Sequence, residues 1–314
     1  MQIWRSKTSP NQKTPIALTI GNFDGVHLGH QAMLSRLRSA ADRLGLAACV
    51  MTFEPHPREF FAPDQAPTRL TSLREKLEQL AVSGIDFTRV YRFNYDFAKI
   101  SPEDFITRIL EKEHSVRWLL VGDDFRFGSR RAGDFDLLMR FSKTKHFEVE
   151  KMTSVLIDNE RVSSTRIRDA LEIGDLQTAQ RFLGRPYSIS GRVTHGDKLG
   201  QKLGIPTANI QIRHNRPPLS GIFVVKVRGA IKSSPMQGLK GVASLGTRPT
   251  IHENGLPVLE VHLFDFNQTI YGYHLQVDFI HKLRNEEKYP DMKSLVRQIN
   301  QDIIDAKAYL QNHG

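Results

Sequence analysis

The pattern of apolar residues changes near residue 185, and this change limits the folds that the chain can adopt. Before it, short strand-like apolar runs at 16–20, 46–53, 85–92 and 117–122 alternate with segments of helical periodicity. Such alternation predicts a parallel sheet with helices on both faces. After it, strand-like segments separated by glycines and prolines follow one another, at 187–194, 221–228, 239–245, 258–266 and 274–281. They predict a small antiparallel barrel or sandwich.

The 314 residues are therefore expected to form an α/β domain at 1–184 and a barrel domain at 185–314, which ends in an amphipathic helix at about 291–310. No apolar run is long enough to span a bilayer, and the first residues lack the apolar core of a signal peptide. Cys49 is the only cysteine. These features favour a cytoplasmic protein that makes no contact with a membrane.

The net charge of +10 indicates an anionic partner. Basic residues exceed acidic ones, and the excess is larger after residue 185. They form no dense block interleaved with aromatic residues, which a nucleic-acid platform would need. The charge therefore favours small phosphorylated ligands and argues against nucleic acid.

A glycine-bearing turn joins the first predicted strand to the first predicted helix, in the stretch LTIGNFDGVHLGH at 18–30. The free N–H groups at a helix N-terminus and the helix dipole favour an anion at such a junction. His27 and His30 bracket Leu28-Gly29 as HxGH, where two imidazoles would meet charge that develops on a phosphate. A surface turn without a ligand remains the alternative for this motif alone.

A second predicted phosphate site lies in VSSTRIR at 162–168, where a serine or threonine would cap a helix and Arg168 follows one turn later. Hydroxyls, free N–H groups and a guanidinium would together hold a di- or triphosphate. An ordinary helix cap with a solvated arginine remains open as the alternative.

The barrel region carries the densest cluster of glycines, in GRVTHGDKLGQKLGIPTAN at 191–209. Glycines let backbone N–H groups approach a phosphate without an intervening side chain. Thr207 and Asn209 supply a hydroxyl and an amide oxygen, which are hard donors suited to Mg²⁺ shared with ATP phosphates. A glycine-rich hairpin without a ligand is the alternative.

Glu260 lies within the apolar run LEVHLF at 259–264, where alternation places it on the face opposite Leu259 and Val261. A carboxylate in such a run is costly to bury unless it is paired or used. It could take a proton from an attacking hydroxyl as a general base. An exposed residue on an edge strand is the alternative. The residues alone thus predict two phosphate-handling sites in two domains.

Seven segments, in this order, resemble those of a known family: IGNFDGVHLGH, TFEPHPREFF, VGDDFRFG, VSSTRIR, GRVTHGDKLGQKLGIPTAN, GVASLGTRPT, and LEVHLFDF followed by LRNEEKY. From about residue 15 to residue 310 the chain resembles the bacterial bifunctional riboflavin kinase/FMN adenylyltransferases. HxGH and SSTxxR by themselves would indicate only the wider nucleotidylyltransferase superfamily.

The resemblance implies a Rossmann-like N-terminal domain that joins FMN to ATP, which makes FAD and releases pyrophosphate. His27 and His30 would stabilise the α-phosphoryl group during in-line attack. The adenylyl pocket would be lined by Gly21, Asn22, Phe23 and Asp24. The leaving phosphates would be held by Ser163, Ser164, Thr165 and Arg168. The flavin would be received by Phe53, Pro55, His56, Pro57, Asp124 and Phe127.

The resemblance also implies a C-terminal riboflavin kinase barrel that converts riboflavin and ATP to FMN and ADP. Thr207 and Asn209 match the Mg²⁺ positions, and Glu260 matches the general base that activates the ribityl 5′-hydroxyl. The nucleotide loop would be shaped by Gly191, His195, Gly196 and Gly200. A mobile flavin-side segment would include Leu283, Arg284 and Glu286. The chain departs from frequent family residues at Gln201, Ser244 and Arg130.

The expected partners are flavins and ATP, with the chain a monomer or a weak homo-oligomer. Two other functions remain open at this point. One is an adenylyltransferase for another small phosphate ester with a non-catalytic barrel, against which the PTAN segment and Glu260 argue. The other is a nucleic-acid-binding protein, in view of the net charge and the similarity of HxGH to the HIGH signature of tRNA-charging enzymes.

Overall fold

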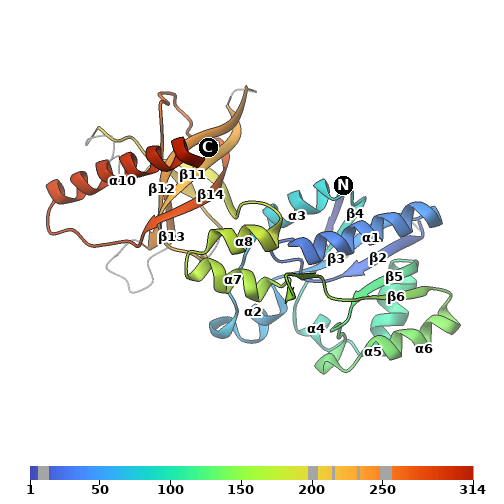
Figure 1. The fold of residues 1–314 in the computed structure, drawn as a ribbon. Helices are drawn as coiled ribbons and strands as arrows, with labels where there is room; N and C mark the ends of the chain where they lie inside the picture. Colours follow the sequence, from blue (N-terminus) through green and yellow to red (C-terminus); the bar gives the residue numbers. More distant parts are fainter. Residues whose placement is uncertain (6–13, 197–203, 214–215, 232–233, 248–256, 314) are drawn as a thin grey trace. The chain divides into compact units, whose positions relative to one another are not determined.

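A computed structural model describes residues 1–5, 14–196, 204–213, 216–231, 234–247 and 257–313 (Figure 1). The chain forms two compact units, which are described separately below. The first consists of Met1–Pro67 and Leu73–Ser163, and the second of Thr68–Ser72 and Ser164–Gly314. None of the helices in the described ranges is long and apolar enough to cross a membrane.

The first unit is built on a six-stranded parallel sheet. Its strands are β1 (Gln2–Arg5), β2 (Ile16–Ile20), β3 (Ala47–Glu54), β4 (Phe87–Arg92), β5 (Val116–Gly122) and β6 (Glu148–Met152), in the order β1-β4-β3-β2-β5-β6. The sequence analysis did not predict β1 and β6. Both are edge strands with partly exposed, polar residues, so neither has the continuous apolar run of a central parallel strand.

Helices cover both faces of this sheet, as predicted. On one face α1 (Leu28–Leu44) and α3 (Leu73–Val82) pack against Ala17 and its neighbours. On the other face, η2 (Phe105–Glu113) and α6 (Phe135–Lys145) pack against Leu18 and its neighbours. Consecutive strand residues enter opposite cores because side chains alternate along a strand.

Shorter elements complete the first unit: α2 (Pro57–Phe61), η1 (Pro63–Gln65), α4 (Tyr95–Ala98), α5 (Pro102–Asp104), η3 (Ser129–Arg131), β7 (Leu156–Ile157) and β8 (Glu160–Arg161). In the sheet, β2 lies between β3 and β5. The chain therefore moves away from β2 on both sides, and the loops that follow β2, β3 and β5 leave the same edge. Ligands of open parallel sheets bind at such a switch point.

The second unit contains a closed antiparallel barrel of six strands. They are β9 (Ser188–Thr194), β10 (Ala208–Gln211), β11 (Gly221–Ile231), β12 (Ser234–Thr247), β13 (Pro257–Leu263) and β14 (His274–Arg284), in the order β10-β13-β12-β11-β14-β9. The region of β10 was not among the strands predicted from the sequence. It is a strand of four residues, too short to show an alternating pattern.

Within the described residues, the second unit contains the helices α7 (Ser164–Glu172), α8 (Leu176–Leu183) and α10 (Met292–His313). Asp175 caps α8, since its Oδ1 accepts from Thr178 N at 2.9 Å. Figure 1 shows α10 beside the barrel strands. There Ala306 and Leu310 form a core with Ile222 and Val242, which face outward from the barrel.

Candidate active sites

The first candidate site begins at the turn after β2. Gly21 N donates to the Met51 carbonyl at 3.0 Å, and Thr52 Oγ1 donates to the Asn22 carbonyl at 3.3 Å. These bonds tie the turn to β3. Phe23 is fully buried in the core beneath α1, and Asp24 is buried too. Of the residues predicted for the adenylyl pocket, Phe23 thus has its ring in the core.

His27 and His30 lie together at the start of α1. His27 is the N-cap of this helix, because its Nδ1 accepts from His30 N at 3.3 Å. The two rings stack with their centroids 3.7 Å apart and their planes inclined by 16°. Because Nδ1 of His27 accepts, a neutral His27 carries its proton on Nε2. The side chains expected at the α-phosphoryl group are therefore held side by side.

His30 is held in its neutral form. Burial lowers its pKa well below 6.5, and positive charge on His27 and on Lys76 of α3 lowers it further. Its Nδ1 has no hydrogen-bond partner among the residues that the structure describes. Lys76 itself is buried. This lysine was not among the site residues predicted from the sequence. The only sequence feature that could have indicated it is the position of a basic residue on the helix face that packs on the sheet.

The loop after β3 carries part of the predicted flavin site: Phe53, Pro55, His56 and Pro57. A cis peptide bond joins Glu54 to Pro55. His56 caps α2, as its Nδ1 accepts from Arg58 N at 3.1 Å. Phe53 packs against Phe93 and Phe97, with ring centroids 5.9 and 5.5 Å apart.

The loop after β5 carries Asp124 and Phe127. Asp124 is exposed and lies 3.0 Å from Arg161, while Phe127 is buried and stacks on Phe125. Arg130 follows with a φ of 54°, in the left-handed region that favours glycine. Arg130, one of the expected departures, thus adopts this conformation at a cost of about 1 kcal/mol.

The residues predicted at the leaving phosphates fall on either side of the boundary between the two units: Ser163, Ser164, Thr165 and Arg168. Ser163 ends the first unit, and a Cβ at Gly29 would lie 3.6 Å from the carbonyl oxygen of the preceding Val162. In the second unit, Arg168 on α7 donates from Nε to the Thr68 carbonyl oxygen. The chain before Ser163 therefore passes beside the HxGH helix.

The second candidate site is a row of cross-strand neighbours on the barrel. Asn209 on β10 pairs with Glu260 on β13, and Glu260 pairs with Ser244 on β12. Leu259 and Val261 are buried, so Glu260 between them faces outward, as the alternation predicted. Directly opposed residues lie on the same face of a sheet, with Cβ atoms about 5 Å apart.

The row continues to the end of β14. Ser244 pairs with Ile222, and Ile222 pairs with Arg284. We call Asn209, Glu260, Ser244, Ile222 and Arg284 the outer row. The barrel thus brings residues far apart in the sequence onto one surface.

Glycines shape the Asn209 end of the outer row. A Cβ at Gly196 would overlap the Asn209 side chain, so only glycine lets this amide lie where it does. A Cβ at Gly191 would overlap the Gln211 carbonyl oxygen, which indicates close strand contact. The His195 ring lies against the Tyr271 ring, with the centroids 3.9 Å apart and the planes inclined by 30°. Two further positions of the predicted loop, Gly200 and the departure Gln201, lie outside the described residues.

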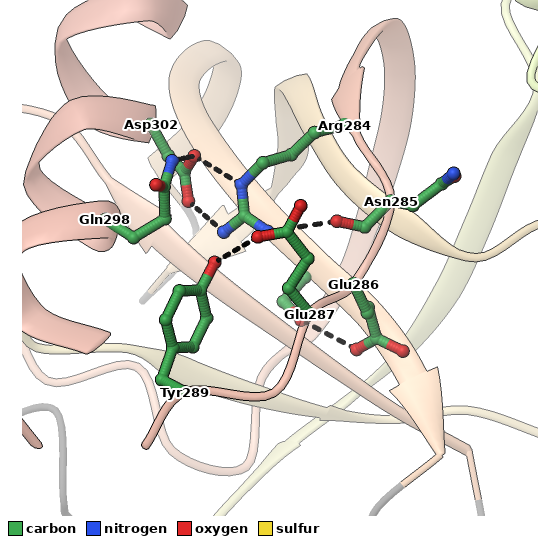
Figure 2. Close-up of polar contacts among 8 residues, drawn as sticks. Arg284, Asn285, Glu286, Glu287, Tyr289, Gln298 and Asp302 are labelled. Atoms are coloured by element: carbon green, nitrogen blue, oxygen red, sulfur yellow. Dashed lines mark hydrogen bonds and ion pairs between the residues drawn. The ribbon is translucent and has the colours of Figure 1, made fainter. Parts of the chain in front are cut away.

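The predicted flavin-side residues lie at the other end of the row (Figure 2). Ser244 Oγ donates to Glu286 Oε1 at 3.4 Å. Partial burial raises the pKa of the Glu286 carboxyl, against the opposing effects of Ser244 and Arg284. Leu283 packs against the core beneath α10. Arg284 turns its guanidinium toward Asp302 of α10.

Asn209 and Glu260 of the outer row, together with Thr207 just before β10, offer donors that fit a magnesium ion shared with phosphates. The hydroxyl of Thr207, the amide oxygen of Asn209 and the carboxylate of Glu260 are all hard oxygen donors. Within the described ranges, no group of three or more His, Cys, Asp or Glu side chains could hold a metal ion. Mg²⁺ at nucleotide sites usually takes several of its ligands from substrate phosphates and water.

Two family models match the chain, one in its N-terminal part and one in its C-terminal part. The model for FAD synthetase matches residues 9–166, and the model for riboflavin kinase matches residues 183–310. The chain is therefore a two-domain transferase that acts on flavins and nucleotides. Its parallel sheet carries the HxGH helix, and the closed barrel that follows carries the outer row.

Curated relatives match along nearly the whole chain. "Bifunctional riboflavin kinase/FMN adenylyltransferase" of Haemophilus influenzae is 48% identical, with 94% of both chains covered. The proteins of the same name from Pseudomonas fluorescens and Escherichia coli K12 are 46% and 44% identical. They cover 92% and 93% of this chain, and 91% and 92% of their own. The chain belongs to the bifunctional riboflavin kinase/FMN adenylyltransferase family.

A solved structure supports the fold. The crystal structure of a Streptococcus pneumoniae protein described as a macrolide-efflux protein matches with a TM-score of 0.79 and 27% identity. The match covers 96% of this chain and 97% of that one. The order of a parallel sheet and then a barrel is therefore shared with an experimental structure.

Proposed function

We propose that the chain makes both flavin cofactors in two steps at two separate sites. The barrel would phosphorylate riboflavin to FMN, and the N-terminal unit would join FMN to the AMP part of ATP to give FAD and pyrophosphate. The observation that carries the proposal is the separation of the two candidate sites. The stacked imidazoles lie at the sheet edge of one unit, and the outer row lies on the barrel of the other.

In the adenylyl transfer, an oxygen of the FMN phosphate attacks the α-phosphorus of ATP while the bond to pyrophosphate breaks. No proton needs to move, so catalysis requires position and charge stabilisation. We assign His27 and His30 to the α-phosphoryl group. His27 can donate from Nε2, and a polyanion beside His30 would act against the burial and the nearby positive charges that lower its pKa.

We assign the remaining predicted residues of this site as the resemblance implies. Main-chain groups of the turn at 21–24 would contact the nucleotide, with Phe23 supporting the turn from below. Ser163, Ser164, Thr165 and Arg168 would hold the leaving phosphates. The loops after β3 and β5 would receive the flavin, which agrees with their position on either side of β2.

In the kinase reaction, Glu260 would take the proton of the ribityl 5′-hydroxyl as its oxygen attacks the γ-phosphorus, and ADP would leave. Asn209 and Thr207 would hold Mg²⁺, which when bound would neutralise charge on the ATP phosphates. Gly196 lets the Asn209 amide reach its place. Gly191, His195 and Gly200 would shape the nucleotide loop, and Leu283, Arg284 and Glu286 would lie on the flavin side.

We further propose a cytoplasmic protein that acts as a monomer or weak homo-oligomer, binds flavins and ATP, and does not bind nucleic acid. The catalytic domains would be 1–184 and 185–314, with α7 and α8 completing the adenylyltransferase. A filter-binding assay with tRNA over a range of salt tests the absence of nucleic-acid binding. Tight binding that weakens steeply with salt would contradict it.

The two-site assignment is tested by separating the activities. His27→Ala should abolish FAD formation from FMN and leave FMN formation from riboflavin unchanged, and Glu260→Ala should do the reverse. Products of riboflavin or FMN with ATP and Mg²⁺ are separated by chromatography, so each variant's intact activity reports that it has folded. Loss of both activities from one substitution in a folded protein would refute the assignment.

A further inference from the structure

The end of β14 is bound to α10 by a buried two-point ion pair (Figure 2). Arg284 donates from Nε to Asp302 Oδ1 at 2.8 Å and from Nη2 to Oδ2 at 2.6 Å. The side chain of Asp302 is only 6% exposed. Gln298, one turn earlier on α10, also donates to Asp302 Oδ1 at 3.0 Å. Two residues, Arg284 and Gln298, thus donate hydrogen bonds to this carboxylate. It lies on α10, a helix to which no catalytic residue has been assigned.

The same guanidinium also orders the chain that follows β14. Arg284 Nη1 donates to the Asn285 carbonyl at 2.9 Å, and the Tyr289 ring lies 5.9 Å from Arg284 Cζ. Tyr289 Oη in turn donates to Glu287 Oε2 at 3.3 Å. We call residues 285–289 the strap. The Arg284 guanidinium contacts both α10 and the strap. Because Asp302 holds this guanidinium in place, it also holds the start of the strap in place.

The strap carries Glu286 to the outer row. Ser244 donates to its Oε1, and a Cβ at Gly246 would overlap its carboxylate, so this group lies directly on the β12 backbone. Ser244 is the cross-strand partner of Glu260. The strap therefore borders the surface on which the proposed general base lies.

We propose that Asp302 is a positioning residue for the kinase site: it orients Arg284, which holds the strap so that Glu286 borders the riboflavin-binding surface of the outer row. This role rests on the kinase site proposed above. Arg284 then links α10 to the strap. The resemblance alone placed it on the flavin side and gave it no specific role. The ion pair should set the affinity for riboflavin more than the rate of phosphoryl transfer.

The test is Asp302→Asn in the full chain, with steady-state kinase kinetics and riboflavin binding followed by quenching of flavin fluorescence. The variant keeps the shape of the side chain but loses the charge that orients the guanidinium. We expect the KM and Kd for riboflavin to rise about tenfold or more, with kcat and the KM for ATP little changed. FAD formation from FMN on the same sample should remain at the native rate.

The barrel offers a closely matched control in Asp278. It is 8% exposed and is bound by Arg228 at 2.8 Å through both oxygens, with Gln276 as a further donor at 3.3 Å. This pair joins β11 to β14 within the barrel wall. Asp278→Asn should therefore leave riboflavin binding unchanged. An equal rise in KM for both variants would mean that any buried charge pair of the barrel has this effect, and would overturn the proposal.

A second substitution keeps the proposal testable if Asp302→Asn fails to fold. Arg284→Lys preserves the charge but cannot bind both carboxylate oxygens and the Asn285 carbonyl together. It should also weaken riboflavin binding. Native affinity in either folded variant would overturn the positioning role. Glu260→Gln separates this result from the proposed function, because retained kcat in that variant rejects the assigned base whatever Asp302 does.

Discussion

Buried His114 should make the N-terminal unit sensitive to acid. Its Nε2 lies 2.6 Å from Tyr91 Oη, and Tyr91 donates to Glu113 Oε2 at 2.9 Å. The imidazole must then donate from Nε2, which leaves Nδ1 as a buried acceptor with no partner among the described residues. Burial, and next the Arg89 guanidinium, lower the pKa of His114 from 6.5 to about 3.

The sign and size of the effect follow from this shift. The unfolded chain binds a proton at His114 below pH 6.5, whereas the folded chain binds it only near pH 3. The free energy of unfolding therefore falls as pH falls through this window, by about 1.4 kcal/mol per pH unit. At about pH 4.5 the loss amounts to about 3 kcal/mol, and above the unfolded pKa it vanishes.

The assay is urea unfolding at about pH 7.5 and about pH 4.5, followed by tryptophan fluorescence. Trp4 and Trp118 are the two tryptophans, and both belong to the N-terminal unit. Tryptophan fluorescence therefore follows the unfolding of this unit and not that of the barrel. On acidification, His114→Gln should lose about 3 kcal/mol less stability than the native chain. His30 also has a lowered pKa, but it is present in both chains and cancels.

Tyr91→Phe is the control, because it leaves His114 buried and should retain the full acid sensitivity. The reasoning is refuted if His114→Gln loses as much stability between the two pH values as the native chain does.

Two further predictions concern the sites themselves. Gly196→Ala should lower kinase kcat by about tenfold or more, because the new methyl group displaces the Asn209 amide, while FAD formation is unaffected. Gly204→Asn, where a Cβ meets nothing within 4 Å and asparagine tolerates the positive φ, should leave the kinase unchanged. Lys76→Met should raise the pKa of His30, because it removes a positive charge that lowers it; an NMR titration of the ring protons measures the shift, and an unchanged pKa would contradict the assigned proximity.

Local patterns were enough to predict the two architectures and the stretches that carry the candidate sites. Apolar periodicity is a short-range property, so the central strands, their helices and the change near residue 185 could be predicted from neighbouring residues. The HxGH turn is equally local, since the spacing of His27 and His30 puts both at one helix start. The outward orientation of Glu260 followed from alternation along one strand.

Tertiary structure decided what depends on partners distant in the sequence. The polar edge strands β1 and β6 are recognisable only by their pairing, and β10 only by closure of the barrel. That closure sets the register that aligns Asn209 with Glu260 and places Arg284 near Asp302. Register and burial are properties of the packed chain. The neighbours of each strand and the counter-ion of each buried charge come from distant segments, and the order of those segments in the sequence does not specify which of them make contact.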